Sequence, residues 1–421
     1  MARLMNRKVV SWALYDWANS AYATAILAGF FPVFFRQYWS QSPPAESTFQ
    51  LGLANSLASL VILILAPLLG AIADAGGLHK RFLLIFAVLG MLMSAGLYFV
   101  GAGQATPALV LFALATIGFS GSIIFYDALL VDVTHASRYD IVSALGYALG
   151  YLGGGLLFAL TVAMALRPHW FGFAGAEAAI QAAFPAVALW WLIFSLPLVL
   201  FVPGRRRQDR LAVSALLRQG GRRLVDTVHH IRQLRPVVLF LLAYWLYIDG
   251  VDTIVRMAVD YGMSLGFSTD NLIVALLITQ FIGFPAAIAF GMLGERIGPR
   301  PAILFALGVY LVVTVWAYFM DSVREFYVLA MVIGLVQGGV QSLSRSLYAR
   351  LIPADRSAEF FGFYNMLGKF AALIGPFLVG AVGLLTGEPR LGILSVVVLF
   401  VAGGVLLCFV DVGQRGQRPN S

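Results

Sequence analysis

Residues 236–262 read PVVLFLLAYWLYIDGVDTIVRMAVDYG. The stretch is long enough to cross a bilayer as a helix, because about 20 apolar residues span the hydrocarbon core. It nevertheless carries four charges, Asp249, Asp252, Arg256 and Asp260, and their spacings of three, four and four residues place them along one helical face. By the lower estimates, a charge at the bilayer centre costs about 2.5–3.5 kcal/mol. The stripe therefore predicts a polar cavity or oppositely charged partners rather than contact with lipid.

The composition of the whole chain is that of a polytopic membrane protein. Of its 421 residues, 60% are hydrophobic and only 11% are charged, and the mean hydropathy is +0.87. A soluble globular chain contains about 25% charged residues. We therefore expect an all-α integral membrane fold that lies in the lipid bilayer.

The net charge of +8 does not indicate a nucleic-acid partner. The basic residues lie in short loops between apolar segments, which is a signal of membrane topology rather than of a DNA-binding surface. Cys408 is the single cysteine, and the five histidines fall in loops or at segment ends. We expect neither a metal site nor a cofactor.

Apolar runs of sufficient length predict twelve transmembrane helices. They lie roughly at 9–37, 50–73, 82–102, 106–132, 142–165, 179–202, 236–262, 271–293, 301–320, 324–350, 358–385 and 391–411. With the N-terminus inside, the inner loops and tails hold 22 of the 28 Lys and Arg residues, and the outer loops hold Arg36, Arg167, Arg324 and Arg390. This bias predicts that both termini are cytoplasmic.

One long polar connection, at 203–235, divides the chain into two sets of six spans and holds nine arginines. We therefore predict an N-terminal bundle at 1–203, a cytoplasmic basic linker at 204–235 and a C-terminal bundle at 236–421. Apolar residues recur within 211–234, which fits one or two amphipathic helices on the inner membrane surface. A solvated basic linker that follows the positive-inside rule is the alternative.

The two halves resemble each other at three places in the same order. WALYDWANS at 12–20 is echoed by WLYIDGVDT at 245–253, GAIAD at 70–74 by GMLGE at 291–295, and LGY at 149–151 by LGK at 367–369. The echoes favour duplication of a six-helix unit. Parallel repeats of this kind place a binding site between the halves, near the membrane midplane.

The loop GAIADAGGLHKR at 70–81 resembles the loop signature of the major facilitator superfamily. That signature has a glycine, an acid four residues later, a second glycine and then basic residues, between spans two and three. The resemblance implies that Asp74 and Arg81 hold the inner gate closed, with the acid at a helix N-terminus or paired with a basic partner. Its degenerate echo at 291–300 implies the same role for Glu295.

A narrower resemblance covers nearly the whole chain. The segments WALYDWANSAYAT at 12–24, LGYALGYLGG at 145–154, QGGVQSLSRS at 337–346 and FFGFY at 360–364 look like the signatures of the vacuole-effluxer family. The resemblance implies the major facilitator fold, and it suggests amino-acid efflux by analogy with the fungal vacuolar members. Because the chain lacks long extra loops, a compact bacterial version in the plasma (inner) membrane is expected.

Span one places Asp16, Asn19 and Tyr22 on one polar face at helical spacing. These side chains either line the cavity and bind solute or a proton, or hydrogen-bond to neighbouring helices near the inner gate. Both interpretations stay open at the level of sequence.

Spans seven and eleven carry the charges expected near mid-membrane. Asp252 and Arg256 are four residues apart and can pair within the helix, which leaves Asp249 more available. In span eleven, Lys369 has the neutral Asn365 one turn before it, so its counter-charge must come from another span, from a solute or from a proton equilibrium. A static bridge from Lys369 to an aspartate of span seven and a bridge that opens during transport are both possible.

Spans four and ten supply a second polar group. Asp127 and Asp132 lie toward the cytoplasmic end of span four and Arg345 toward the same end of span ten, and we predict a gating role for these three. Gln337 and Gln341, one turn apart in span ten, are candidates for neutral hydrogen bonds to a solute.

The leading hypothesis is a secondary active transporter rather than an enzyme, in which two bundles alternate access to a central site. A site with carboxylates and an ammonium group suits a small charged or zwitterionic organic solute, and a membrane aspartate could couple transport to protons. We expect it to act as a monomer. A lipid or lysolipid translocator on the same fold is one alternative, and a membrane-embedded enzyme, for which the histidines show no metal-ligand spacing, is a remote one.

Overall fold

The computed structural model describes residues 6–205, 213–230, 234–264, 266–370 and 374–411, and within these ranges the regular structure is entirely helical. Twelve helical stretches of this part are long and apolar enough to cross a membrane, which confirms the predicted number of spans. In the N-terminal half, span one is α1 (Arg7–Ala21), η1 (Tyr22–Phe30), α2 (Phe31–Phe34) and η2 (Phe35–Trp39). Span two is α3 (Pro44–Gly76), span three is α4 (His79–Gly96) with η3 (Leu97–Phe99), and span four is α5 (Ala105–Ala128) with α6 (Leu130–Val133). Span five is η4 (Ala136–Arg138) with α7 (Tyr139–Leu166), and span six is α8 (Ala176–Phe201), which η5 (Pro168–Phe171) precedes. In the C-terminal half, spans seven to ten are α10 (Arg235–Ser264), α11 (Thr269–Ile297), α12 (Pro299–Phe319) and α13 (Val323–Leu351). Span eleven is α14 (Ser357–Phe370) and α15 (Ile374–Thr386), preceded by η7 (Ala354–Arg356). Span twelve is α16 (Pro389–Leu394) and α17 (Val397–Cys408).

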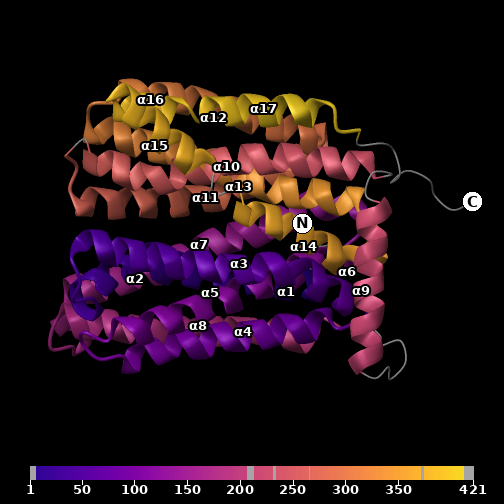
Figure 1. The fold of residues 1–421 in the computed structure, drawn as a ribbon, viewed down its shortest axis with the longest axis horizontal. Helices are drawn as coiled ribbons and strands as arrows, with labels where there is room; N and C mark the ends of the chain where they lie inside the picture. Colours follow the sequence, from indigo (N-terminus) through magenta and orange to yellow (C-terminus); the bar gives the residue numbers. More distant parts are fainter. Residues whose placement is uncertain (1–5, 206–212, 231–233, 265, 371–373, 412–421) are drawn as a thin grey trace, which may run out of the picture.

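The spanning helices form two bundles of six that lie side by side (Figure 1). The N-terminal bundle, in indigo and purple, occupies the lower half of the view, and the C-terminal bundle, in pink to yellow, occupies the upper half. Helix α9 (Val213–His230), which belongs to the connection between them, runs across the right-hand end of the spanning helices. We call this the linker end and the opposite side the far end. The positive-inside rule predicts that the linker end is cytoplasmic.

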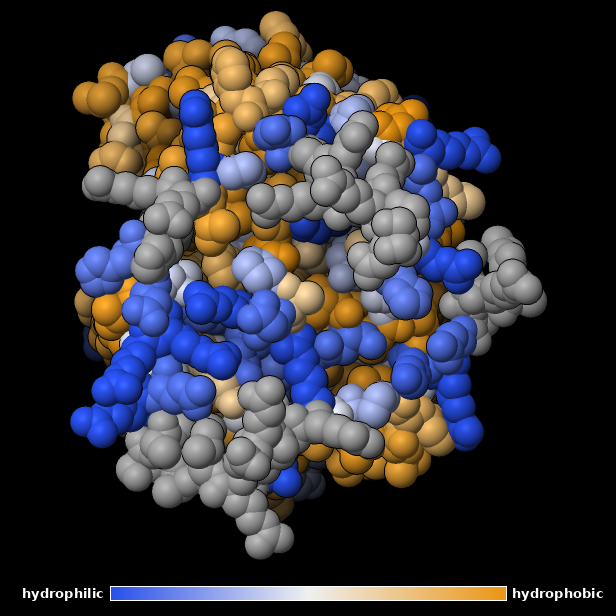
Figure 2. All heavy atoms as spheres, turned by 90° about the vertical axis from the view of Figure 1, so that its right-hand side faces the viewer, coloured by the Kyte–Doolittle hydropathy of each residue, from blue (hydrophilic) through white to orange (hydrophobic). Residues whose placement is uncertain are grey.

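The surface of the molecule has the polarity that a bilayer requires. Large apolar side chains such as Ile64, Leu92 and Val312 are 60% or more exposed, although each lies within a spanning helix. Figure 2 shows the linker end, where hydrophilic residues gather, with hydrophobic residues on its flanks. Exposed apolar side chains around the flanks and polar ones at the end place the bilayer around the bundles.

The equivalent turns of the two halves both contain a glycine with a positive φ. Gly77 follows the end of α3 with φ 64° and ψ 34°, and Gly298 follows the end of α11 with φ 90° and ψ 153°. Both values lie in the region that glycine adopts without steric cost. The two loops that resemble each other in sequence therefore also share a glycine that reverses the chain between two spans.

The bundles approach each other closely at the linker end. A Cβ added to Gly70 of α3 would overlap the backbone of Ala358 in α14, and one added to Gly362 of α14 would lie 2.7 Å from the carbonyl oxygen of Ala66 in α3. Small residues allow two helix backbones to come this near. Spans two and eleven are therefore in backbone contact across the two bundles.

Helix α9 packs on the protein rather than standing apart from it. Gly220 is buried, and a Cβ at this position would lie 2.6 Å from the Ile72 side chain of α3. Thr227 is also buried, and its hydroxyl accepts a hydrogen bond of 3.0 Å from Arg356 of the C-terminal bundle. Within its described part, the connection therefore contacts both bundles, and the sequence alone left that arrangement open.

Candidate functional site

A polar cavity of about 260 Å³ lies between the two bundles. The N-terminal bundle contributes residues from spans one, four and five, and the C-terminal bundle contributes residues from spans eight and ten. The lining residues are Asp16, Asn19, Ser20, Ala23, Thr24, Phe119, Ile123, Tyr126, Asp127, Tyr147, Gly150, Tyr151, Gln280, Gln337, Gln341 and Arg345. Six of the predicted site and gating residues, from three helices, therefore meet at one cavity.

Arg345 of α13 is the positive charge of this cavity, and its residue is only 1% exposed. Its Nη1 lies 3.0 Å from Asp127 Oδ1 and 3.7 Å from Asp16 Oδ2, and both carboxylates belong to the other bundle. Its Nε and Nη2 donate to the hydroxyl and the carbonyl of Ser143 in α7, each at 2.8 Å. The guanidinium also lies 4.4 Å from the ring centroid of Tyr147. Charge-assisted bonds and a cation–π contact thus compensate its removal from water.

Each of the two carboxylates beside Arg345 has a further partner. Tyr126 donates its hydroxyl to Asp16 Oδ2 at 3.1 Å, and Asn365 of α14 donates its amide to Asp127 Oδ2 at 3.1 Å. Asp127 therefore binds two spans of the C-terminal bundle. Asp16, in contrast, is held within its own bundle and makes only the longer contact with Arg345.

Two cavity residues hold amide atoms that lack a partner in the described part of the chain. The Nδ2 of Asn19, a donor, and the Oε1 of Gln337, an acceptor, are both buried without a hydrogen bond. Gln341, one turn from Gln337, instead accepts from the Tyr151 hydroxyl at 3.0 Å. Since a buried polar group without a partner costs about 1–3 kcal/mol, each of these amides would be stabilised by a polar partner.

Other predicted site residues do not line this cavity. Tyr22 is buried inside the N-terminal bundle, where its hydroxyl lies 2.8 Å from Thr116 Oγ1. Asp252 and Lys369 are partly buried in the C-terminal bundle, and each takes part in further polar interactions. The side chain of Arg256 lies outside the described residues.

Asp249, the first of the four charges of span seven, is fully buried within the C-terminal bundle. Its carboxylate accepts the backbone N–H of Ile374 at 3.1 Å and that of Gly375 at 3.0 Å, and the Thr253 hydroxyl at 3.3 Å. Ile374 and Gly375 are the first described residues of α15. Asp249 therefore joins spans seven and eleven inside the C-terminal bundle through two backbone N–H groups.

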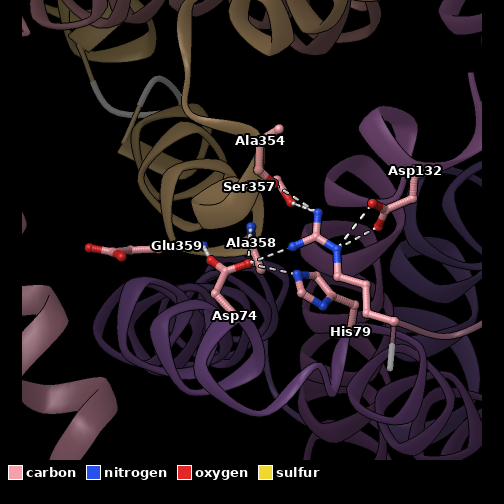
Figure 3. Close-up of polar contacts among 8 residues, drawn as sticks. Asp74, His79, Asp132, Ala354, Ser357, Ala358 and Glu359 are labelled. Atoms are coloured by element: carbon pink, nitrogen blue, oxygen red, sulfur yellow. Dashed lines mark hydrogen bonds and ion pairs between the residues drawn. The ribbon is translucent and has the colours of Figure 1, made fainter. Parts of the chain in front are cut away.

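At the linker end, Asp74 also accepts backbone N–H groups, and here the contact joins the two bundles (Figure 3). Its side chain is fully buried, and it accepts the backbone N–H of Ala358 at 3.2 Å and that of Glu359 at 2.8 Å in the first turn of α14. His79 lies 2.7 Å from the same carboxylate. Figure 3 shows Asp74 between His79 and this helix start, while the Glu359 side chain points away.

The remaining gating candidates, Asp132, Arg81 and Glu295, lie at the linker end of their spans. Asp132 binds Arg205, near the start of the connection, through both carboxylate oxygens at 3.0 and 2.9 Å. Arg81 is exposed at the start of α4, and Glu295 is exposed near the end of α11. Of the two acids in the echoed loops, Asp74 is thus buried at the interface, whereas Glu295 is exposed.

On the opposite side of the interface, Asp140 in the first turn of α7 takes the equivalent place. It accepts from Arg350 Nη2 at 2.7 Å and from the Ser346 hydroxyl at 2.5 Å, and both donors belong to α13. Gly294 of α11 packs directly against it. Asp140 therefore ties span five to the C-terminal bundle, as Asp74 ties span eleven to the N-terminal bundle.

Sequence reasoning missed several residues of these two regions. They are His79, Tyr126, Asp140, Ser143, Tyr147, Tyr151, Arg205, Gln280 and Arg350. The tyrosines have the helical spacing of a core face, and the charged residues look like ordinary loop and interface charges, so no local pattern distinguished them. Among the described residues, no group of three or more His, Cys, Asp or Glu is arranged to hold a metal ion.

Comparison with known proteins gives consistent matches over nearly the full length. The family model described as "Vacuole effluxer Atg22 like" matches residues 45–136 and 131–420. A Bacillus subtilis protein, "Uncharacterized MFS-type transporter YxiO", is 38% identical over 427 aligned residues and covers 99% of both chains. "Autophagy-related protein 22" of Coccidioides immitis is 23% identical over 535 aligned residues, which cover 98% of this chain and 88% of that protein.

Solved structures show the same fold at low sequence identity. The proton:xylose symporter XylE aligns with a TM-score of 0.69 at 14% identity and covers 96% of this chain and 94% of its own. FucP, described in an outward conformation, aligns with a TM-score of 0.69 at 12% identity and covers 98% and 100%. The two bundles are therefore arranged as in the major facilitator fold.

Proposed function

Because the chain belongs to the vacuole effluxer family of major facilitator transporters, and is thus a secondary transporter, we propose that it moves a small zwitterionic or charged organic solute by alternating access. The observation that carries the proposal is the cavity between the bundles. There an unpaired amide donor of Asn19 and an unpaired acceptor of Gln337 accompany the guanidinium of Arg345 and two carboxylates.

The charges of the cavity fit a zwitterion. A carboxylate of the solute would compete for the planar guanidinium of Arg345, whose geometry suits bidentate bonds to carboxylates. An ammonium group would bind Asp16, because its 3.7 Å contact with Arg345 is longer than the 3.0 Å contact that occupies Asp127. Asn19 and Gln337 would then orient the rest of the solute.

The size of the cavity also favours a small solute. Its 260 Å³ is below the roughly 300–1,000 Å³ of pockets for drug-sized ligands. Its mixed polar lining does not suit an acyl chain, so we prefer a small polar solute over a lipid or lysolipid. Amino-acid efflux across a bacterial plasma membrane, with both termini cytoplasmic, is the form of the proposal to test first.

Proton coupling is the second part of the proposal. Asp16 lies in the cavity and has only one short bond, to the Tyr126 hydroxyl. It could therefore exchange a proton when solute binds or leaves. Asp16→Asn should keep exchange of solute between the two sides but lose acceleration by a proton gradient.

The test is a flux assay in proteoliposomes. Labelled amino acids, organic cations and lysolipids are supplied with and without a proton gradient, and Asn19→Ala and Gln337→Ala are compared with Gln181→Ala, which lies on α8 away from the cavity. We expect flux of at least one zwitterion, with KM raised about tenfold or more in the two cavity variants, as expected when a buried hydrogen bond to the solute is lost. Flux of lysolipid alone, or cavity variants that match the control, would overturn the proposal.

A further inference from the structure

Arg205 stands at the end of span six, where the connection between the bundles begins, and it contacts four other residues at once. Its Nε binds both oxygens of Asp132, at 3.0 and 2.9 Å, and its Nη1 lies 3.4 Å from Asp74. Its Nη2 donates to the carbonyl of Ala354 and to the Ser357 hydroxyl, each at 2.9 Å. The two aspartates belong to the N-terminal bundle, whereas Ala354 and Ser357 begin span eleven of the C-terminal bundle.

We propose that Arg205 is a positioning residue that latches the linker end shut, so that the connection is a working part of the gate. All three guanidinium nitrogens carry part of this contact, and the planar fork sets their directions. Bonds of a guanidinium to carboxylates are about twice as strong as neutral ones. The Asp132 side chain is 28% exposed and that of Arg205 is 21% exposed, so solvent weakens these bonds only in part.

Covalent linkage decides which bonds must break when the gate opens. Arg205 lies four residues after the end of α8 at Phe201 and binds Asp132 and Asp74 of the N-terminal bundle, so it moves with that bundle. If the bundles separate at the linker end, its bonds to Asp132 persist and its bonds to Ala354 and Ser357 are lost. Asp132 thus holds the guanidinium in place, and the two bonds to span eleven form the latch itself.

The surroundings of Arg205 allow these two bonds to open and close. A polar hollow of about 390 Å³, lined by residues that include Arg205, Arg223 and Asp355, borders Ala354. Water in this hollow can replace the bonds to span eleven at modest cost. The latch therefore adds to the buried Asp74 contact a release point that lies next to solvent.

The test measures opening of the linker end by the rate of thiol labelling, without any solute. In a Cys408→Ser background, Ser342→Cys places a thiol at a fully buried residue of α13, whose carbonyl accepts from Ser143 of the other bundle at 2.7 Å. A membrane-impermeant maleimide is applied to inverted membrane vesicles, which expose the linker side if the predicted topology holds. We expect Arg205→Ala to raise the labelling rate about tenfold, as loss of charge-assisted bonds implies. Arg205→Lys should fall between Arg205→Ala and the parent, because an ammonium cannot copy the fork.

The controls separate a latch from a general effect. Arg222→Ala removes another arginine of the connection, exposed on α9, and should leave labelling unchanged. A thiol at the exposed Ser137 should react equally in all variants. Equal labelling of Arg205→Ala and Arg222→Ala would overturn the proposal. If Arg205→Ala does not fold, the labelling rate of Ser357→Ala is compared instead, since this variant removes only one latch bond.

The inference rests on alternating access but not on the solute. A flux assay that finds no zwitterion would leave the labelling result standing, and unchanged labelling would leave the proposed solute standing. The two failures are therefore distinguishable.

Discussion

Arg345 and Asp127, 218 residues apart in the sequence, form an ion pair of 3.0 Å that joins the two bundles. The side chains are 2% and 4% exposed, so the pair lies in a nearly dry environment. Both residues also line the central cavity. In alternating access the bundles separate at the linker end in one state, and this pair must then break or exchange partners.

Loss of Arg345 should therefore be costly for stability as well as for transport. Arg345→Ala leaves the Asp127 carboxylate buried beside Asp16 without its cation, and an uncompensated buried charge destabilises by about 3–5 kcal/mol. We expect a clear fall in the Tm of the solubilised protein and loss of flux. Thermal unfolding followed by fluorescence measures the first effect, and proteoliposome flux measures the second.

A double variant checks the cause of that fall. Arg345→Ala combined with Asp127→Asn removes both charges of the pair and keeps an acceptor for Asn365. We expect it to regain part of the Tm, because neighbouring residues that interact are not additive. If the Tm changes of Arg345→Ala and Asp127→Asn simply add in the double variant, loss of the ion pair is not the cause of the fall in Tm.

Gly70 should be a sensitive point of the bundle interface. A Cβ at Gly70 would overlap the carbonyl of Ala358 and the Cα of Glu359, and backbone atoms cannot swing aside as a side chain can. Gly70→Ala should push the linker end open, raise thiol labelling at residue 342 and reduce flux. Gly52→Ala, on the same helix α3 with nothing within 4 Å of the added Cβ, is the matched control. Unchanged labelling in Gly70→Ala would mean that the two helices do not stay this close.

Asp249 should affect stability through the two backbone N–H groups of span eleven that it accepts. Asp249→Ala leaves the N–H groups of Ile374 and Gly375 without an acceptor, at a cost of about 1–3 kcal/mol, whereas Asp249→Asn keeps one acceptor oxygen. We expect a lower Tm for the alanine variant, a smaller fall for asparagine and little change for Thr253→Val. Asparagine should also keep most of the flux. If instead flux is lost while the Tm is unchanged, Asp249 acts in solute or proton binding, as its position in the sequence first suggested.

Most of the fold and part of the site could be predicted from the sequence. Apolar runs located the spans because the bilayer imposes their length, and helical spacing placed Asp16 with Asn19 in span one and Gln337 with Gln341 in span ten. Their common cavity followed from the repeat of the two halves. These features depend on residues that are near one another in the chain or on the constraint of the membrane.

The partners of single charges could not be predicted in the same way. The carboxylate of Asp249 binds the backbone N–H groups of Ile374 and Gly375, which lie 125 and 126 residues away in the chain and which no residue type marks as its donors. Arg205 looked like one of nine arginines that mark the inner side. Its role depends on Asp132 and Ser357, which reach it only after the two bundles meet.

A bond between the bundles on the far-end side of the cavity should have the opposite effect on opening of the linker end to that of the latch at Arg205. Gln280 of α11 donates to Thr24 Oγ1 at 2.8 Å, and this bond crosses the bundles on the far-end side of the Arg345 pair. Since opening of one end accompanies closure of the other, Gln280→Ala should favour the state that is open at the far end and lower thiol labelling at residue 342 by a few-fold, as expected for one neutral hydrogen bond.

Thr24→Val removes the same bond, so the two changes together should do no more than either alone. Gln280→Ala combined with Arg205→Ala should return labelling toward the parent value, because each shifts one equilibrium in opposite directions. A rise in labelling with Gln280→Ala alone would contradict this coupling of the two ends.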